Sequence, residues 1–255
     1  MSLFVRSVLF VAVLLGSSGL ARAADPPKTI VLVHGAFADS SSWDRVVPLL
    51  EAKGYNVVSV YDPMSSLSDD AAATKRFIDA QPGPVLLVGH SYGGAVITVA
   101  GANDKVVGLV YVAAFAPDAG ESVNDLGKGQ PPPPWAAALK VDSGGFASLP
   151  TEVVLKYFAP DVPAAEGKLI AVKQGPINTK CFEEKAPVAA WKTKPSWFVL
   201  PKKDQMIPPA AQDVMSKRAK GTVTAVDASH VVMLSKPKEV ADVILAAATK
   251  SFAAK

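Results

Sequence analysis

Residues 84–97 decide how this chain folds, and they read Pro-Val-Leu-Leu-Val-Gly-His-Ser-Tyr-Gly-Gly-Ala-Val-Ile. The apolar run at the start predicts a buried strand, and the small residues at the end predict a helix. The turn between them fits the pattern Gly-x-Ser-x-Gly, which carries meaning where a strand precedes it and a helix follows. A serine on so sharp a turn needs neighbours without side chains, and Gly89 and Gly93 provide that space. Ser91 is therefore the candidate nucleophile, presented at a helix N-terminus.

Strand-like and helix-like patterns alternate around this turn, which is typical of a parallel sheet covered by helices. The pattern predicts an α/β fold with six parallel strands, at residues 29–33, 56–61, 84–88, 106–113, 196–200 and 222–226. A helix is predicted after the first strand, where apolar residues recur at helical spacing from Trp43 to Leu50, with Ser41 as its N-terminal cap. A last helix is expected from Ser235.

Residues 119–195 interrupt this alternation between the fourth and fifth strands. They contain four consecutive prolines, at 131–134, which form a stiff, extended segment. Because ligands of open α/β sheets bind beyond the carboxyl ends of the strands, we expect the insertion to form a small lid at that edge. The core of the fold then consists of residues 24–118 and 196–255.

A serine hydroxyl needs a base to take its proton, and the chain has three histidines. His34 lies in the turn after the first strand, and His90 lies inside the turn that carries Ser91. His230 lies between the last strand and the last helix, where the chain order serine, acid, histidine places the base. We therefore expect His230 to be the base, and His34 to hold its own loop in place.

The imidazole of the base needs a carboxylate that holds it in the right tautomer. Asp204, at the end of the fifth strand, is the preferred candidate. Asp118, at the end of the fourth strand, is the alternative, because some hydrolases with a serine and a histidine take their acid from that strand.

Acyl transfer also needs donors aimed at the oxyanion that forms on the carbonyl oxygen. After a turn of this kind, one donor is the backbone N–H of the residue that follows the nucleophile, here Tyr92. The second is expected from the turn after the first strand. We assign it to the N–H of Ala36, with Phe37 as the alternative.

Composition excludes several classes of protein. The chain has 255 residues, of which 49% are hydrophobic and 19% are charged, so it is not intrinsically disordered and is long enough for one α/β domain with an insertion. A single cysteine excludes a disulfide framework, and three histidines leave little material for a metal site. We expect no metal and no cofactor, and we expect Cys181 to be a small residue packed under the lid rather than a reactive thiol.

Residues 1–23 have the layout of a secretory signal. Arg6 precedes an apolar run, and small residues follow it up to Ala21 and Ala23, which fit an A-x-A cleavage site. The run is too short to anchor the chain in a membrane, so we expect no stable membrane insertion and a periplasmic or secreted protein. Without the two arginines of this segment, 24 basic residues face 23 acidic ones. A nearly neutral chain offers no electrostatic case for binding nucleic acid.

Four groups of residues carry a resemblance to a known family: His34 with Gly35, the run 89–94, Asp204 followed by Ile207 and Pro208, and His230. Together they resemble the α/β-hydrolase fold. The longer phrases 33–43, 88–97, 111–122 and 194–197 resemble an exported, esterase-like bacterial branch of that superfamily, related to plant methylesterases and hydroxynitrile lyases. The resemblance covers essentially the whole mature chain, and it implies a serine hydrolase.

The expected activity is the cleavage of small neutral, apolar or aromatic carboxylic esters through an acyl-enzyme. The aromatic residues expected to bind the substrate are Phe37, Trp135, Phe158 and Phe182. We expect a monomer or a homodimer. The alternatives are a catalytically silent ligand-binding protein, a cofactor-free perhydrolase and a hydroxynitrile lyase. Plant hydroxynitrile lyases carry a lysine and a threonine where this chain has Val231 and Gly35, which speaks against that last activity.

Overall fold

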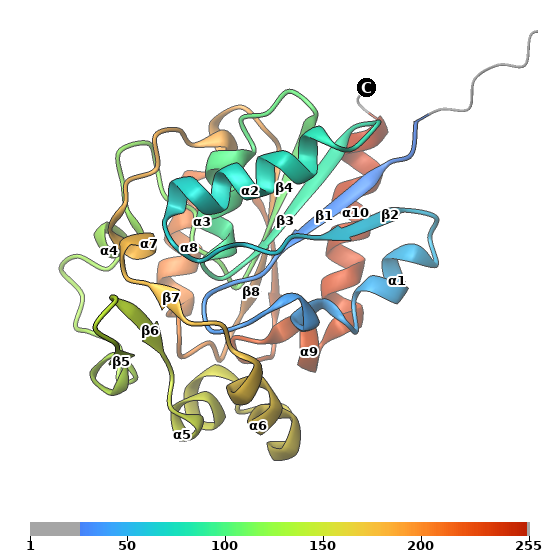
Figure 1. The fold of residues 1–255 in the computed structure, drawn as a ribbon. Helices are drawn as coiled ribbons and strands as arrows, with labels where there is room; N and C mark the ends of the chain where they lie inside the picture. The colour runs from blue at the N-terminus through green and yellow to red at the C-terminus, as the bar shows by residue number, and fades with distance from the viewer. Residues whose placement is uncertain (1–25, 254–255) are drawn as a thin grey trace, which may run out of the picture.

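The structure is a computed structural model that describes residues 26–253. Six strands form one fully parallel sheet in the order β2-β1-β3-β4-β8-β9 (Figure 1). The strands are β1 Thr29–Val33, β2 Asn56–Ser59, β3 Val85–His90, β4 Val106–Val112, β8 Ser196–Pro201 and β9 Thr222–Val226. The predicted fold class, an α/β fold on a six-stranded parallel sheet, is confirmed.

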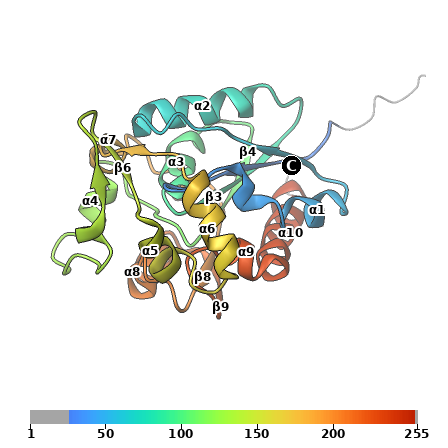
Figure 2. The same ribbon diagram turned by 60° about the horizontal axis from the view of Figure 1, so that its bottom comes forward.

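Helices cover both faces of this sheet. Two of them, α2 Leu67–Asp79 and α3 Gly93–Ala100, pack together on one face, and α1 Val47–Glu51 packs with α10 Pro237–Ala253 on the other (Figure 2). Two further helices, α8 Pro209–Arg218 and α9 Val232–Ser235, follow β8 and β9. The last long helix therefore begins two residues after the predicted Ser235.

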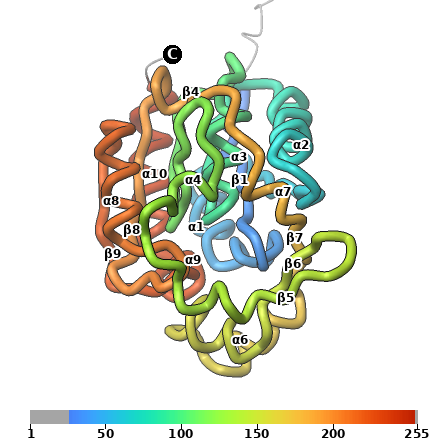
Figure 3. The backbone as a smooth tube through the Cα atoms, turned by 90° about the vertical axis from the view of Figure 1, so that its left-hand side faces the viewer, coloured from blue at the N-terminus to red at the C-terminus, as the bar shows by residue number. Residues whose placement is uncertain are grey.

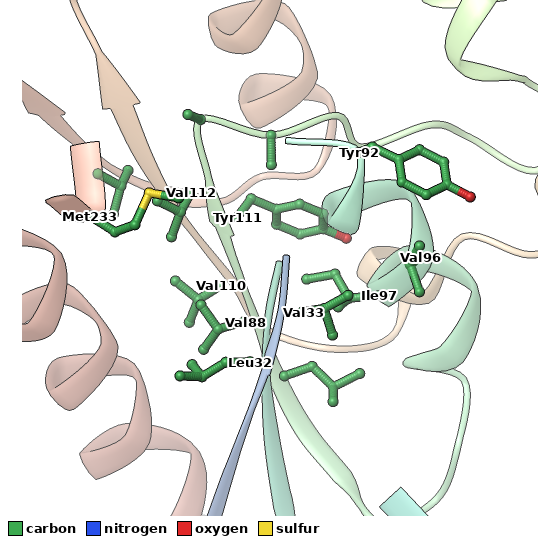
Figure 4. Packing of buried hydrophobic residues seen from close by; sticks show 14 of the residues in the cluster. Leu32, Val33, Val88, Tyr92, Val96, Ile97, Val110, Tyr111, Val112 and Met233 are labelled. Atoms are coloured by element: carbon green, nitrogen blue, oxygen red, sulfur yellow. The ribbon is translucent and has the colours of Figure 1, made fainter. Parts of the chain in front are cut away.

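The four central strands are buried along their whole length, whereas β2 and β9, at the sheet edges, are partly exposed. Strands covered on both faces need apolar residues at every position, which is why they stand out as continuous runs in the sequence. Leu32, Val88 and Val110 are neighbours in register and point toward α10. Val33 and Tyr111 point toward α3 on the opposite face (Figure 4).

The first predicted helix is wrong in its extent and in its cap. The chain forms a short 3-10 helix, η1 Ser40–Trp43, and α1 begins only afterwards. Asp39 caps η1 by accepting a hydrogen bond from the backbone N–H of Ser41 at 2.7 Å. Pro48 lies in the first turn of α1, where its missing N–H costs no intrahelical bond, so a new helix begins there.

Residues 119–195 lie between β4 and β8, and most of them lie beyond the carboxyl ends of the strands (Figures 1 and 3). The last part, around residues 190–192, packs against α3 and leads to the amino end of β8. Three short strands of this insertion, β5, β6 and β7, form an antiparallel sheet of their own. The helices and strands of the whole insertion are α4 Val123–Leu126, η2 Ala136–Ala138, β5 Lys140–Val141, β6 Phe146–Ser148, α5 Thr151–Val153, the π-helix η3 Val154–Phe158, α6 Ala164–Lys173, β7 Ile177–Asn178, α7 Lys180–Glu183 and η4 Ala190–Lys192.

Two predictions about the organisation of the chain stay predictions. The division into core and lid at residues 118–119 and 195–196 is one of them. The signal sequence at residues 1–23 is the other, and it lies outside the described residues. Within residues 26–253, no helix is long and apolar enough to cross a bilayer.

Candidate active site

The turn between β3 and α3 holds Ser91 in a strained backbone conformation. Its φ angle is +54°, in the left-handed region that residues with a side chain rarely occupy. A Cβ atom at Gly89 would lie 2.4 Å from the Gly93 carbonyl oxygen, and a Cβ at Gly93 would lie 2.6 Å from the carbonyl oxygen of His34. Both positions therefore require glycine, and they do so because the turn carries the serine close to the neighbouring backbone.

A continuous chain of hydrogen bonds joins Ser91, His230 and Asp204. The imidazole Nε2 of His230 lies 2.9 Å from the Ser91 Oγ, and its Nδ1 lies 2.8 Å from the Asp204 Oδ2. An ionised carboxylate only accepts, so Nδ1 donates to Asp204 and leaves Nε2 free to accept the serine proton. All three residues are buried, with 6%, 1% and 3% of their surface exposed. They come from the ends of three different strands, and the fold brings them to one edge of the sheet.

Asp204 lies in a cage of donors. Its Oδ1 accepts the backbone N–H groups of Met206 at 2.8 Å and Ile207 at 3.0 Å. Its Oδ2 accepts the side-chain amide of Gln212 at 2.7 Å, in addition to the His230 imidazole. Gln212 is buried and comes from α8. Nothing in the sequence marks this glutamine, because its partner is set by the packing of α8 against the loop after β8.

The alternative acid, Asp118, has other partners. Its carboxylate pairs with Lys192 and accepts the backbone N–H of Ala119 at 2.6 Å. The side chain is partly exposed. The structure therefore places Asp204, and not Asp118, at the imidazole of His230.

The two remaining histidines are buried, and each donates a ring N–H to a backbone carbonyl oxygen in the loops of the site. His90 Nε2 donates to the carbonyl oxygen of His230 at 3.0 Å, and His34 Nδ1 donates to the carbonyl oxygen of Gly35 at 3.1 Å. Burial lowers the pKa of both imidazoles, that of His90 well below its ordinary value. Both rings are therefore neutral and act as hydrogen-bond donors within the scaffold.

The loop after β1 passes directly over the candidate nucleophile. A Cβ at Gly35 would lie 2.6 Å from the Cβ of Ser91. Phe37, two residues further on, has a φ angle of +59°, so the loop turns sharply at this point. Among residues 26–253, the N–H groups of Ala36 and Tyr92 donate to no protein acceptor. The predicted oxyanion donors thus lie on the two segments that flank Ser91.

Two of the four predicted substrate-binding aromatics, Phe37 and Phe182, pack against each other. The ring of Phe182 lies 6.5 Å from that of Phe37 and 5.8 Å from that of Tyr92, between centroids. The other two contact the catalytic loops. Trp135 donates its indole N–H to the carbonyl oxygen of Met206 at 3.3 Å, and Phe158 is buried edge-to-face against the His230 ring at 5.1 Å.

Tyr92, which directly follows Ser91, belongs to a buried hydrogen-bonded group with Asp70 and Cys181. The phenol of Tyr92 donates to the Asp70 Oδ2 at 2.7 Å, and the Cys181 Sγ lies 3.7 Å from the same oxygen. Burial raises the pKa of Asp70 to about 6 and that of Cys181 to about 12. A thiol with so high a pKa stays protonated and is a poor nucleophile, in agreement with a packing role for Cys181.

Comparison with known proteins agrees with this geometry. Residues 30–243 match the alpha/beta hydrolase family. The chain belongs to this family. The predicted resemblance is therefore confirmed, and with it the interpretation of residues 84–97 from which the fold was predicted.

Several members of the family are similar over most of their length. A pyrethroid hydrolase of Sphingobium wenxiniae is 28% identical over 84% of this chain and 85% of its own. Methylesterase 1 of Arabidopsis thaliana is 26% identical over 86% of this chain and 95% of its own. Among solved structures, a pyrethroid hydrolase from Sphingobium faniae shares the fold with a TM-score of 0.74, at 24% identity over 87% of this chain and 97% of that chain. These likenesses establish an α/β hydrolase related to esterases.

Proposed function

We propose that the protein is a serine hydrolase that cleaves carboxylic esters through an acyl-enzyme. The observation that carries this proposal is the unbroken hydrogen-bond chain from Asp204 through His230 to Ser91. An isolated serine hydroxyl is a weak nucleophile, and an imidazole held 2.9 Å from it is the base that activates it. The esterases and hydrolases among the relatives support the same class of reaction.

The reaction proceeds in two halves. The Ser91 Oγ attacks the acyl carbon while the His230 Nε2 takes its proton, and the carbonyl oxygen becomes an oxyanion that accepts from the N–H groups of Ala36 and Tyr92. The C–O bond to the alcohol then breaks, and His230 returns the proton to the leaving alcohol. Water repeats the sequence on the acyl-enzyme, which releases the carboxylic acid and restores the Ser91 hydroxyl.

Asp204 stabilises the imidazolium that forms in each half of the reaction. Its negative charge lies 2.8 Å from Nδ1, and the bond fixes the tautomer that leaves Nε2 ready to accept. The backbone N–H groups of Met206 and Ile207 donate to the other oxygen, Oδ1, and hold the carboxylate in this orientation. We therefore assign the roles of nucleophile, base and acid to Ser91, His230 and Asp204.

We propose small neutral esters with apolar or aromatic groups as substrates. The ring of Phe37, from the loop that passes over the nucleophile, packs with that of Phe182, and such rings favour apolar groups over charged ones. The relatives named pyrethroid hydrolase and methylesterase support hydrolysis of an ester.

Hydrolysis of p-nitrophenyl acetate and butyrate tests the proposal. We expect turnover by the purified protein, loss of turnover in Ser91→Ala, and covalent labelling of Ser91 by a fluorophosphonate, which reacts only with an activated serine. Labelling without turnover of any ester would indicate that the activated serine serves another reaction. Absence of both labelling and turnover would overturn the proposal and favour a ligand-binding role.

We also propose that the protein is exported through residues 1–23. The layout of that segment supports the proposal, since a charged start, an apolar run and small residues at the end are what signal peptidase recognises. Expression in a bacterial host followed by intact mass measurement tests it. We expect the exported product to begin at residue 24, and a product that keeps residue 1 would contradict the proposal.

A further inference from the structure

The base His230 lies on a short loop, residues 227–231, that joins β9 to α9. Two of the contacts between the core and the backbone of this loop lie on either side of Ser229. The backbone N–H of Lys203 donates to the carbonyl oxygen of Ala228 at 3.0 Å, and the imidazole of His90 donates to the carbonyl oxygen of His230 itself at 3.0 Å. Ser229 lies between these two contacts, directly before the base, and a residue outside the core holds it.

Ser229 is held by Asp161, which belongs to the insertion. One carboxylate oxygen of Asp161 accepts the backbone N–H of Ser229 at 2.7 Å, and the other accepts its hydroxyl. Both oxygens therefore engage one residue, which fixes the direction of the contact as well as its length. Ser229 is 1% exposed, so its N–H and hydroxyl have little access to water as a replacement partner.

The same short segment contacts the imidazole of the base. Phe158, three residues before Asp161, packs its ring edge against the ring of His230 at 5.1 Å and against that of His90 at 6.4 Å. It is the last residue of the π-helix η3, and a π-turn of this kind often occurs at functional sites. Residues 158–161 thus contact the base through its ring and through the backbone that precedes it.

A second polar contact ties the insertion to the far side of the base. Arg45 pairs with Glu166 of α6 at 2.8 Å and donates its other guanidinium nitrogen to the carbonyl oxygen of Leu234, in α9. This contact is more exposed than the first and lies four residues beyond His230. On the far side of the base this polar contact acts through Arg45, whereas Asp161 contacts directly the residue next to the base.

We propose that Asp161 is a positioning residue for His230: its bidentate contact with Ser229 holds the imidazole at the distance and angle at which it takes the proton from Ser91. The insertion then serves the chemical step as well as the enclosure of substrate. This inference rests on the proposed serine-hydrolase mechanism, because it concerns the activation of Ser91 by His230.

Substitution of Asp161 tests the inference. In Asp161→Ala we expect kcat for p-nitrophenyl butyrate to fall by about 10- to 100-fold, since small displacements of a catalytic group are costly, while KM stays within about twofold. Asp161→Asn keeps one acceptor oxygen and should recover most of the loss. Ser229→Ala removes the hydroxyl contact alone and should lower kcat by about 3-fold. In the double variant Asp161→Ala with Ser229→Ala, kcat should be no lower than in Asp161→Ala, because both changes remove one interaction.

Glu166→Gln is the matched control. It weakens a contact of the same insertion with the core but leaves Ser229 untouched, so kcat should stay within about twofold of the wild type. The rate of fluorophosphonate labelling of Ser91 should fall in Asp161→Ala in parallel with kcat, and this readout needs no ester turnover. If Asp161→Ala does not fold, Asp161→Asn and Ser229→Ala carry the same test.

The outcomes separate this inference from the proposed function. Unchanged kcat and labelling in Asp161→Ala, or a rise in KM at constant kcat, would overturn the positioning role while leaving the serine mechanism intact. Ester turnover that persists in Ser91→Ala would instead overturn the proposed function, whatever the behaviour of Asp161→Ala. An equal loss in Glu166→Gln would also overturn the inference, because it would trace the effect to loosening of the whole insertion.

Discussion

Two buried carboxylates, Asp204 after β8 and Asp70 in the first turn of α2, differ in their surroundings. Asp204 accepts from two backbone N–H groups, the amide of Gln212 and the imidazole of His230. Asp70 accepts from one backbone N–H, one phenol and the Cys181 thiol, and a second buried acid, Asp62, lies nearby. Burial raises the pKa of Asp70 to about 6. The two buried carboxylates therefore differ in the donors around them, four for Asp204 and three for Asp70.

The largest expected effect comes from Asp204, the carboxylate that contacts the base. In Asp204→Asn the amide presents a donor or a weaker acceptor to His230, so the favoured tautomer changes and kcat for p-nitrophenyl butyrate should fall by about 10⁴-fold. Asp118→Asn is the control, since Asp118 pairs with Lys192 and should leave kcat within about twofold. A large loss in Asp118→Asn with retained activity in Asp204→Asn would reverse the assignment of the acid.

Asp70, the other carboxylate, should make the free energy of unfolding depend on pH. Because burial raises the pKa of Asp70 from 3.8 to about 6, the folded protein binds this proton more tightly than the unfolded chain. The free energy of unfolding should therefore fall as pH rises from about 4 to about 6, by on the order of 1–3 kcal/mol, and level off above. Urea unfolding at a series of pH values measures it, and Asp70→Asn should reduce the slope.

Two neighbours of Asp70 sharpen this prediction. Burial also raises the pKa of Asp62 well above its ordinary value, so Asp62 should supply the part of the slope that remains in Asp70→Asn. Asp69, exposed on the same helix, has a pKa lowered by the hydroxyls of Ser65 and Ser66. Asp69→Asn should therefore leave the fall in stability between pH 4 and 6 in place, and a slope that vanished there would contradict the assignment to the buried pair.

A smaller effect is expected when the cage around Asp204 loses one donor. Gln212→Leu keeps most of the side-chain volume but leaves the Asp204 Oδ2 with His230 as its remaining donor. We expect kcat to fall about 10-fold, which corresponds to about 1.4 kcal/mol. Gln205→Leu, the same substitution at an exposed position next to Asp204, is the control. Equal kcat in the two variants would mean that the amide does not orient the acid.

The smallest effect should come from Cys181, next to Asp70. Burial raises the pKa of its thiol to about 12, so the native protein should react slowly with a thiol reagent, and one thiol per chain should appear on unfolding. Cys181→Ala should leave kcat within about twofold. Rapid reaction of the native thiol would show that the segment around Cys181 opens readily.

The parts of the structure that the sequence predicted well are those controlled by local rules. Central parallel strands are buried on both faces and must be apolar throughout, so β1, β3, β4 and β8 stand out as runs. The turn at Ser91 requires glycine at positions 89 and 93 because a Cβ there would collide with the neighbouring backbone. The helix around Trp43 was predicted less well, since apolar spacing is the same in one helix and in two segments separated by a break, which here lies between Trp43 and Val47.

The sequence by itself determined the α/β fold and the turn that presents Ser91, and it indicated His230 as the base with Asp204 preferred over Asp118 as the acid. These predictions follow from local sterics and from the order of strand ends along the chain. The structure then placed Asp204 at the imidazole. Only the tertiary structure decided that Gln212 and Asp161 surround the acid and the base. Both contacts depend on how α8 and the insertion settle against loops distant in sequence. The sequence does not show which partner a polar residue will have. Residues distant along the chain come within hydrogen-bond reach of it only when the protein folds and the elements pack.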